Sequence, residues 1–255
     1  MPTILQTLTI ISFFSPRIVC INNSIVSTNT ELVLNRTEYC KAHRECFLKG
    51  QSKKMIGYML GEEVFNFLSK NAVTSDLWIN LHVLLEQTNK SGLKKWIYGE
   101  KNSGATKRGI QDVTGKQLNR GDRVAIFTTK RQIARANTIN GNYAFACAFS
   151  SISSTIPTTR HELFRQQLIG SSKLYAFSDD TKGCFEKYLY FTKIECALKC
   201  HLDMVCRSFY FNTVSPTCIH ALYVDSLLTR SHWQTNSKSW QRISRPTWSL
   251  RKDGN

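Results

Sequence analysis

Three cysteines in the second half of the chain have a spacing that suits either a metal ion or disulfide bonds. Cys196, Cys200 and Cys206 are separated by three and by five residues. With His201 or His220 as a further ligand, they would offer the sulfur and nitrogen atoms that zinc prefers. The intervals lack the C-x2-C spacing of structural zinc sites, and an oxidising compartment favours paired cysteines. We therefore expect disulfide bonds, no metal site and no cofactor.

The chain contains residue types used in catalysis, but they do not form a known catalytic motif. No Ser, His and Asp set shows a nucleophile elbow or a triad pattern. The glycines between Gly99 and Gly109 lack the strand and helix that frame a phosphate-binding loop. The sequence therefore predicts a binding protein rather than an enzyme.

The charge of the chain is strongly positive. Its 255 residues include 34 Lys and Arg against 18 Asp and Glu, a net charge of +16. Such a charge attracts polyanions or serves only solubility. For a secreted protein, nucleic acid is excluded, and sulfated or sialylated glycans or anionic microbial surfaces are the expected partners. The densest basic stretches are Lys41–Lys54, Lys94–Arg123, Lys130–Arg135 and the tail.

The amino-terminal segment predicts secretion. Residues 3–14 read TILQTLTIISFF, a run too short for the roughly 20 residues of a membrane span but suited to a signal peptide. We predict a signal peptide over 1–20 and no membrane span elsewhere; the alternative is an apolar strand of the mature fold. The N-x-S/T pattern, which accepts N-linked glycans in a secreted protein, occurs at Asn22, Asn35 and Asn89.

Cleavage after Cys20 would leave eight cysteines, an even number that suits disulfide pairing. They fall into two groups, on either side of the Ser/Thr-rich stretch SSISSTIP at 150–157. This stretch predicts two domains joined by a linker over 151–179. The basic tail, 244–255, is expected to be frayed.

In the first half, the apolar periodicity predicts two helices followed by short strands. Tyr39, Ala42 and Cys46 form a helical stripe, with Thr37 as the expected cap and Gly50 as the expected end. A second helix is predicted over 62–71. Strands are predicted over 76–85, 95–98, 122–128 and 142–149. This order is typical of the α+β class.

Several motifs in this half resemble those of the C-type lectin-like domain. They are an aromatic-x2-Ala-x3-Cys helix from Tyr39 to Cys46, the strand WINL at 78–81, the strand WIY at 96–98, and a closing strand ending at Cys147. The resemblance covers residues 36–150. It implies a Cys46–Cys147 disulfide, whose loop of about 100 residues would stabilise the domain by several kcal/mol.

The chain departs from this family at the calcium site. Calcium-dependent relatives place carboxylates and a proline in a long loop, where this chain reads GKQLN at 115–119. The second ligand stretch, 135–140, has no aspartate, so the resemblance implies the fold without its calcium site. We take the residues of this loop region as candidate ligand-binding residues: Lys116, Gln117, Asn119, Arg120 and Arg123.

The second half resembles a PAN/apple module over 180–243. A helix through Cys196 and Cys200 is followed by an alternating strand, RSFYF at 207–211. The resemblance implies an α+β module held by two disulfide pairs, Cys196–Cys218 and Cys200–Cys206. Cys40 and Cys184 remain; they bridge the domains, pair between chains or stay free.

These features together predict a secreted recognition protein. It would bind glycans or other anionic ligands without calcium, in defence, adhesion or the extracellular matrix. The alternative is a calcium-independent module that binds extracellular proteins, as a toxin-like or inhibitor-like partner. The oligomeric state stays open.

Overall fold

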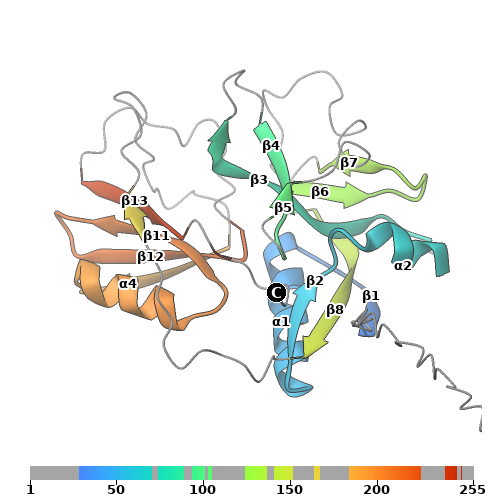
Figure 1. Ribbon diagram of the computed structural model, residues 1–255, viewed down its shortest axis with the longest axis horizontal. Coiled ribbons are helices and arrows are strands. Elements are labelled where there is room, and N and C mark those ends of the chain that lie inside the picture. The colour runs from blue at the N-terminus through green and yellow to red at the C-terminus, as the bar shows by residue number, and fades with distance from the viewer. Residues whose placement is uncertain are drawn as a thin grey trace, which may run out of the picture.

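The computed structural model describes residues 29–70, 74–88, 94–100, 103–104, 124–136, 141–151, 164–166, 184–224, 239–245 and 248. Helices and strands form two mixed α and β units side by side (Figure 1). The predicted signal segment, 1–20, lies outside the described residues.

The first unit is built on an eight-stranded sheet with two helices. The helices are α1 (Tyr39–Ser52) and α2 (Val64–Lys70). The strands are β1 (Asn29–Thr37), β2 (Met55–Met59), β3 (Leu77–Thr88), β4 (Lys94–Tyr98), β5 (Ser103–Gly104), β6 (Val124–Phe127), β7 (Ile133–Arg135) and β8 (Tyr143–Ser151). The four predicted strands correspond to β3, β4, β6 and β8, whereas the sequence did not predict β1, β2, β5 and β7.

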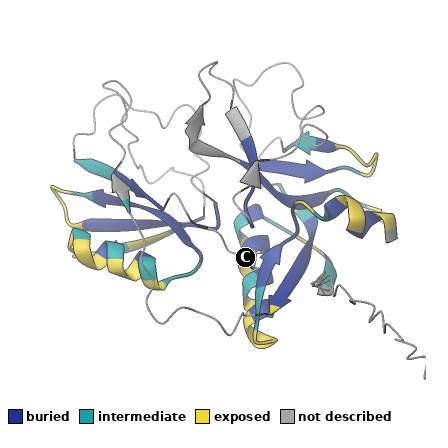
Figure 2. Cartoon of the chain, in the orientation of Figure 1, coloured by how far each residue is buried: buried dark blue, intermediate teal, exposed yellow. Residues whose placement is uncertain are grey.

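Strand β8 is the centre of this sheet. It pairs with β1 along one edge, and with β3 and then β2 along the other. Seven consecutive residues of β8 are buried (Figure 2), which is typical of a strand covered on both faces. The sheet therefore has its core around β8, where Cys46 of α1 is bonded to Cys147 at a Cα–Cα distance of 5.2 Å.

Helix α1 differs from the prediction at both ends. Its N-cap is Glu38, whose side chain makes no capping bond, while the Thr37 carbonyl accepts the Trp78 indole N–H at 2.8 Å. The helix passes through Gly50 and ends at Ser52. A Cβ at Gly50 would lie 2.1 Å from the backbone nitrogen of Gly57 in β2. Gly50 therefore serves close packing of α1 on β2 rather than helix termination.

The second unit is a five-stranded sheet carrying α4 (Lys193–Leu202). In spatial order its strands are β10 (Phe185–Leu189), β12 (Thr217–Leu222), β11 (Cys206–Asn212), β13 (Trp240–Ser244) and β9 (Arg165–Gln166). Thr192 and Glu195 form a capping box at the start of α4. Disulfides Cys196–Cys218 and Cys200–Cys206 fix the buried side of the helix, and they are the pairs that the resemblance implied.

Parts of the predicted linker and of the predicted frayed tail belong to this second unit instead. Strand β9 lies within the expected linker, 151–179, but pairs with β13. At the start of the expected tail, Ser244 is in β13, and Arg245 and Trp248 are buried. The prediction of a frayed tail is wrong for these residues, because their side chains have polar partners inside the unit.

A fourth disulfide, Cys40–Cys184, joins α1 to the segment that leads into β10. The sequence left three possibilities open for these two cysteines, and the structure shows the disulfide bond between the units. The ring of His43 stacks on Tyr223 from the second unit, with centroids 5.1 Å apart. The two units therefore share a covalent and a packed contact.

Candidate ligand-binding surfaces

The five candidate residues of the loop region, Lys116, Gln117, Asn119, Arg120 and Arg123, lie outside the described residues. The structure does describe the strands on either side, β5 and β6. Strand β6 starts directly after Arg123, is buried throughout, and pairs with both β3 and β7. The described chain therefore resumes, directly after the candidate region, in a buried strand of the first unit.

The hairpin that continues from this region presents a basic turn. Lys130 and Arg131 join β6 to β7 and are exposed. The turn is fixed by the Asp76 carboxylate, which accepts the Thr129 backbone N–H at 2.9 Å. Arg131 has a positive φ of 60°, a conformation that is uncommon for a residue other than glycine. The turn thus presents two cations at the surface, and hydrogen bonds hold its backbone.

The basic residues of α1 are partly neutralised. Lys49 and Lys53 both contact the Glu31 carboxylate of β1, at 2.5 and 2.9 Å. Hydrogen bonds from Lys49 and then Lys53 lower the pKa of Glu31, so the carboxylate stays charged at neutral pH. Lys41 pairs with Glu38 at 3.4 Å. This face therefore offers an anionic ligand less free charge than the sequence stretch Lys41–Lys54 indicates.

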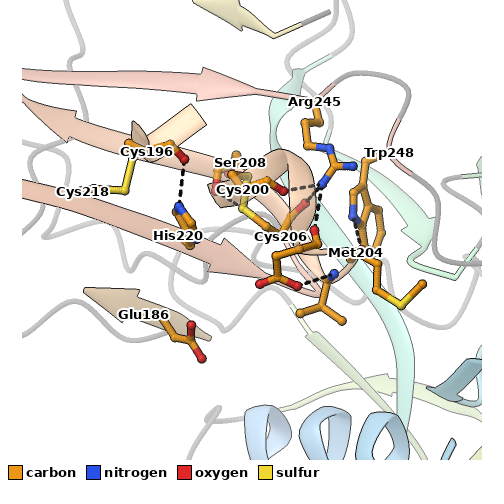
Figure 3. The surroundings of a disulfide bond; sticks show 12 residues. Glu186, Cys196, Cys200, Met204, Cys206, Ser208, Cys218, His220, Arg245 and Trp248 are labelled. Atoms are coloured by element: carbon orange, nitrogen blue, oxygen red, sulfur yellow. Dashed lines mark hydrogen bonds between the residues drawn. A yellow bond between two sulfur atoms is a disulfide. The ribbon is translucent and has the colours of Figure 1, made fainter. Parts of the chain in front are cut away.

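Three arginines of the second unit are buried and hold its structure together. They are Arg207, Arg242 and Arg245, each with at most 6% of its surface exposed. Arg245 donates to three backbone carbonyls (Figure 3), and the Arg207 guanidinium lies over the Trp248 ring, 4.6 Å from its centroid. These cations do not face a solution ligand, so +16 overstates the charge available for binding.

A buried polar contact joins the two units. Nη1 of Arg207 lies 3.3 Å from Nε2 of His82 in β3. A guanidinium only donates, so His82 must accept at Nε2 and is neutral. Burial first, then the charge of Arg207, and then the electrostatic interaction with the His43 ring hold the pKa of His82 well below its usual value. Burial likewise lowers the pKa of His43 to about 3. Both rings thus act as neutral packing groups between the units.

The cysteines of the second unit that lie close enough to share a metal ion are bonded in disulfides instead. His220 lies close to the sulfur atoms of Cys196 and Cys218, and also to those of Cys200 and Cys206. All four sulfurs are in disulfide bonds and offer no thiolate to zinc. Nε2 of His220 lies 3.1 Å from the carbonyl oxygen of Cys196 (Figure 3). The arrangement thus holds α4 against β12.

One of the three sequons is described. The register between β1 and β8 shifts between Val33 and Thr37, and Asn35 lies exposed in this irregular segment. The side chain of Asn35 is therefore accessible to a glycan. Asn22 and Asn89 lie outside the described residues.

Two features of the structure could not be read from the sequence. One is the set of carbonyls around Arg245, which no local pattern marks. The other is a row of exposed apolar residues on α4, namely Ile194, Leu198 and Leu202. Their spacing of four residues is visible in the sequence, but only the tertiary structure shows that this side of α4 faces away from the sheet.

Within the described ranges, no helix combines the length and apolar character needed to cross a membrane. Four disulfide bonds are typical of proteins outside the cell.

No protein-family model matches the sequence, and no curated protein matches it either. Among solved structures, the chain is similar to the C-type lectin CEL-I from Cucumaria echinata, with 14% identity and a TM-score of 0.36, covering 48% of this chain and 90% of that one. It is also similar to ovocleidin-17, a major protein of the Gallus gallus eggshell calcified layer, with 13% identity, a TM-score of 0.34, and coverage of 48% and 91%. At these values the similarity concerns the chain trace of about half the molecule and assigns no residue a role.

Proposed function

We propose that this chain is a secreted, non-catalytic recognition protein that binds anionic glycans without calcium. Its first unit, 36–150, would be a C-type lectin-like domain. Its second, 180–243 with β9 and Trp248 added, would be a PAN/apple module. Sulfated or sialylated glycans are the expected ligands, because their fixed negative charges complement a basic surface.

The observation that carries this proposal is the exposed pair Lys130 and Arg131. The pair lies on the hairpin that continues from the candidate region, and its turn is held by Asp76. Because the Asp76 contact already orders the backbone of this turn, binding an anion has to immobilise only the two side chains.

The test is retention on a heparin column and binding to a glycan array, each with calcium and with a chelator. Retention should fall steeply with salt, since charges are screened over about 8 Å at physiological ionic strength. K130S/R131N should elute at lower salt; asparagine is chosen because it tolerates the positive φ. K116S/R120S/R123S tests the loop region in the same way.

The matched control is K41S/R44S, which removes the same charge from exposed residues of α1, away from the β6–β7 hairpin in Figure 1. Equal retention of the turn variant and this control, which each lose two positive charges, would mean that net charge alone explains the contribution of the turn. Binding that requires calcium would contradict the proposal.

The second candidate function is binding of an extracellular protein. It is favoured by the exposed apolar row on α4, because large exposed apolar patches mark protein-interaction surfaces. A chain that binds no glycan on the array but captures a protein through α4 would support this function instead.

A further inference from the structure

Helix α4 carries a row of apolar side chains toward solvent, which we call the α4 stripe: Ile194, Leu198 and Leu202. Their exposed fractions are 81%, 55% and 74%. Residues four apart lie on one face of a helix, and Figure 2 shows the outer side of α4 as largely exposed. The opposite face carries the two buried disulfides, so the helix cannot rotate to hide the stripe.

Further exposed apolar residues lie at the start of this helix. Tyr190, 88% exposed, lies two residues before the N-cap Thr192, and its backbone N–H donates to the Pro216 carbonyl at 2.7 Å. This bond brings Tyr190 next to the β11–β12 turn, where Val214 is 81% exposed. Large exposed apolar patches on soluble proteins mark interaction surfaces.

The charges beside the stripe identify the partner. Glu195 and Lys199 are both exposed and lie on the same flank of the stripe, four residues apart. The Lys199 ammonium lies over the Tyr188 ring, 4.7 Å from its centroid, and would leave this contact to reach a partner. Hydrogen bonds with Thr192 lower the pKa of Glu195 and use one carboxylate oxygen, Oε2, so the side chain is ionised and its other oxygen can take a second partner. If an identical helix packs antiparallel across Leu198, Glu195 lies opposite the partner's Lys199, and Lys199 lies opposite the partner's Glu195.

We propose that the α4 stripe is the contact through which two copies of this chain form a two-fold symmetric dimer. Such an interface is isologous: Leu198 meets its own counterpart, and Ile194 faces the end of the partner's stripe. Rows of residues four apart on two helices interdigitate in the commonest class of helix packing. The dimer does not depend on the proposed function, but it would give a glycan-binding chain two sites and therefore avidity.

The carboxylate in the contact argues against the main competing occupant. An anionic lipid surface would attract Lys199 but leave Glu195 without a cation, whereas a second copy supplies an opposite charge for both. Because the partner is an identical chain, the proposal can be tested with the purified full chain alone.

Sedimentation equilibrium of the full chain under non-reducing conditions measures the association. We expect a concentration-dependent monomer–dimer equilibrium. L198D should abolish it, because two carboxylates would be buried on the symmetry axis. L48D is the matched control: Leu48 of α1 is also about half exposed, at 50%, but lies outside the stripe. The control should dimerise like the wild type.

Charge reversal tests the antiparallel geometry. K199E places like charges opposite each other twice in a dimer, and so does E195K. Each variant should weaken self-association about tenfold, the effect of turning two modest ion pairs into repulsions. An equimolar mixture should associate again, because each variant then offers the charge that the other needs. This recovery also controls for helix damage from losing the capping glutamate.

A wild-type chain that stays monomeric at several hundred micromolar would overturn the proposal. So would an L198D variant that still dimerises, or a mixture that associates no better than the single variants. If the wild-type chain binds phosphatidylserine vesicles, the L198D chain does not, and no dimer forms in solution, the stripe binds membranes instead.

Discussion

Arg245 should be essential to the stability of the second unit, although the sequence places it in a basic tail. Its Nη1 donates to the carbonyl oxygens of Cys200, Asp203 and Cys206, at 3.0, 3.1 and 2.6 Å. These carbonyls belong to the end of α4 and the turn that follows it. The substitution that tests this is Arg245→Met, which keeps the length and apolar stem of the side chain but removes the hydrogen-bond donors.

The expected loss follows from these contacts. Nη1 has two N–H groups shared among three acceptors, and a hydrogen bond with a charged partner contributes about 1.5–3 kcal/mol. Two such bonds give about 3–6 kcal/mol. Removing a buried charge offsets part of this cost. We expect a net loss of about 3 kcal/mol in the free energy of unfolding, which in a chain of this size lowers Tm by roughly 6–12 °C.

Thermal and guanidinium unfolding under non-reducing conditions would measure this loss. Arg36→Met is the control, because Arg36 is exposed on β1; surface substitutions usually change stability by less than about 0.5 kcal/mol. A chain ending at Ser244 should lose at least as much as the Arg245 variant, since it also lacks Trp248. If Arg245→Met and Arg36→Met unfold at the same temperature, Arg245 does not hold the turn and this reasoning is wrong.

Four further outcomes are expected. Gly57→Ala should destabilise the first unit by several kcal/mol or prevent folding, because its Cβ would lie 2.0 Å from the Cys46 carbonyl oxygen; near-wild-type denaturation would contradict the close packing. Cys147→Ser should cost about 2–5 kcal/mol, and non-reducing peptide mapping of the wild type should find Cys46 bonded to Cys147. The pKa of His43, lowered to about 3, means that the unfolded chain binds a proton that the folded chain does not. Stability should therefore fall by about 2 kcal/mol between pH 6.5 and 5 from this group alone, and His43→Phe should remove that share; an unchanged slope would exclude it. Millimolar calcium and a chelator should give the same melting curve, and a calcium-specific rise in Tm would reveal ligands outside the predicted stretches.

Much of the secondary structure could be predicted from local pattern. The stripe of Tyr39, Ala42 and Cys46 predicted α1, and the apolar runs predicted β3, β4, β6 and β8, because the period of buried residues is a property of the segment itself. Strands β1 and β2 were missed. Their pairing with β8 stabilises them, and a segment shows no sign of its partner.

The candidate site was predictable only in part. The sequence marked Lys130–Arg135 as a basic stretch, and the structure exposes Lys130 and Arg131 at its turn. It could not show that Lys49 and Lys53 contact Glu31, because these ion pairs depend on α1 packing beside β1. Charge can be counted along a chain, but whether a charge is free depends on what folds against it.

The sequence by itself determined helices α1, α2 and α4, strands β3, β4, β6, β8 and β11 and, through its motifs, three of the four disulfide pairs. Only the tertiary structure decided that Cys40 bonds to Cys184 across 144 residues of chain, that Arg245 is buried, and that Leu198 faces water. The reason is physical. Helical and strand periods arise from neighbours within a few residues, whereas burial and long-range bonds depend on which distant surfaces meet when the two units pack.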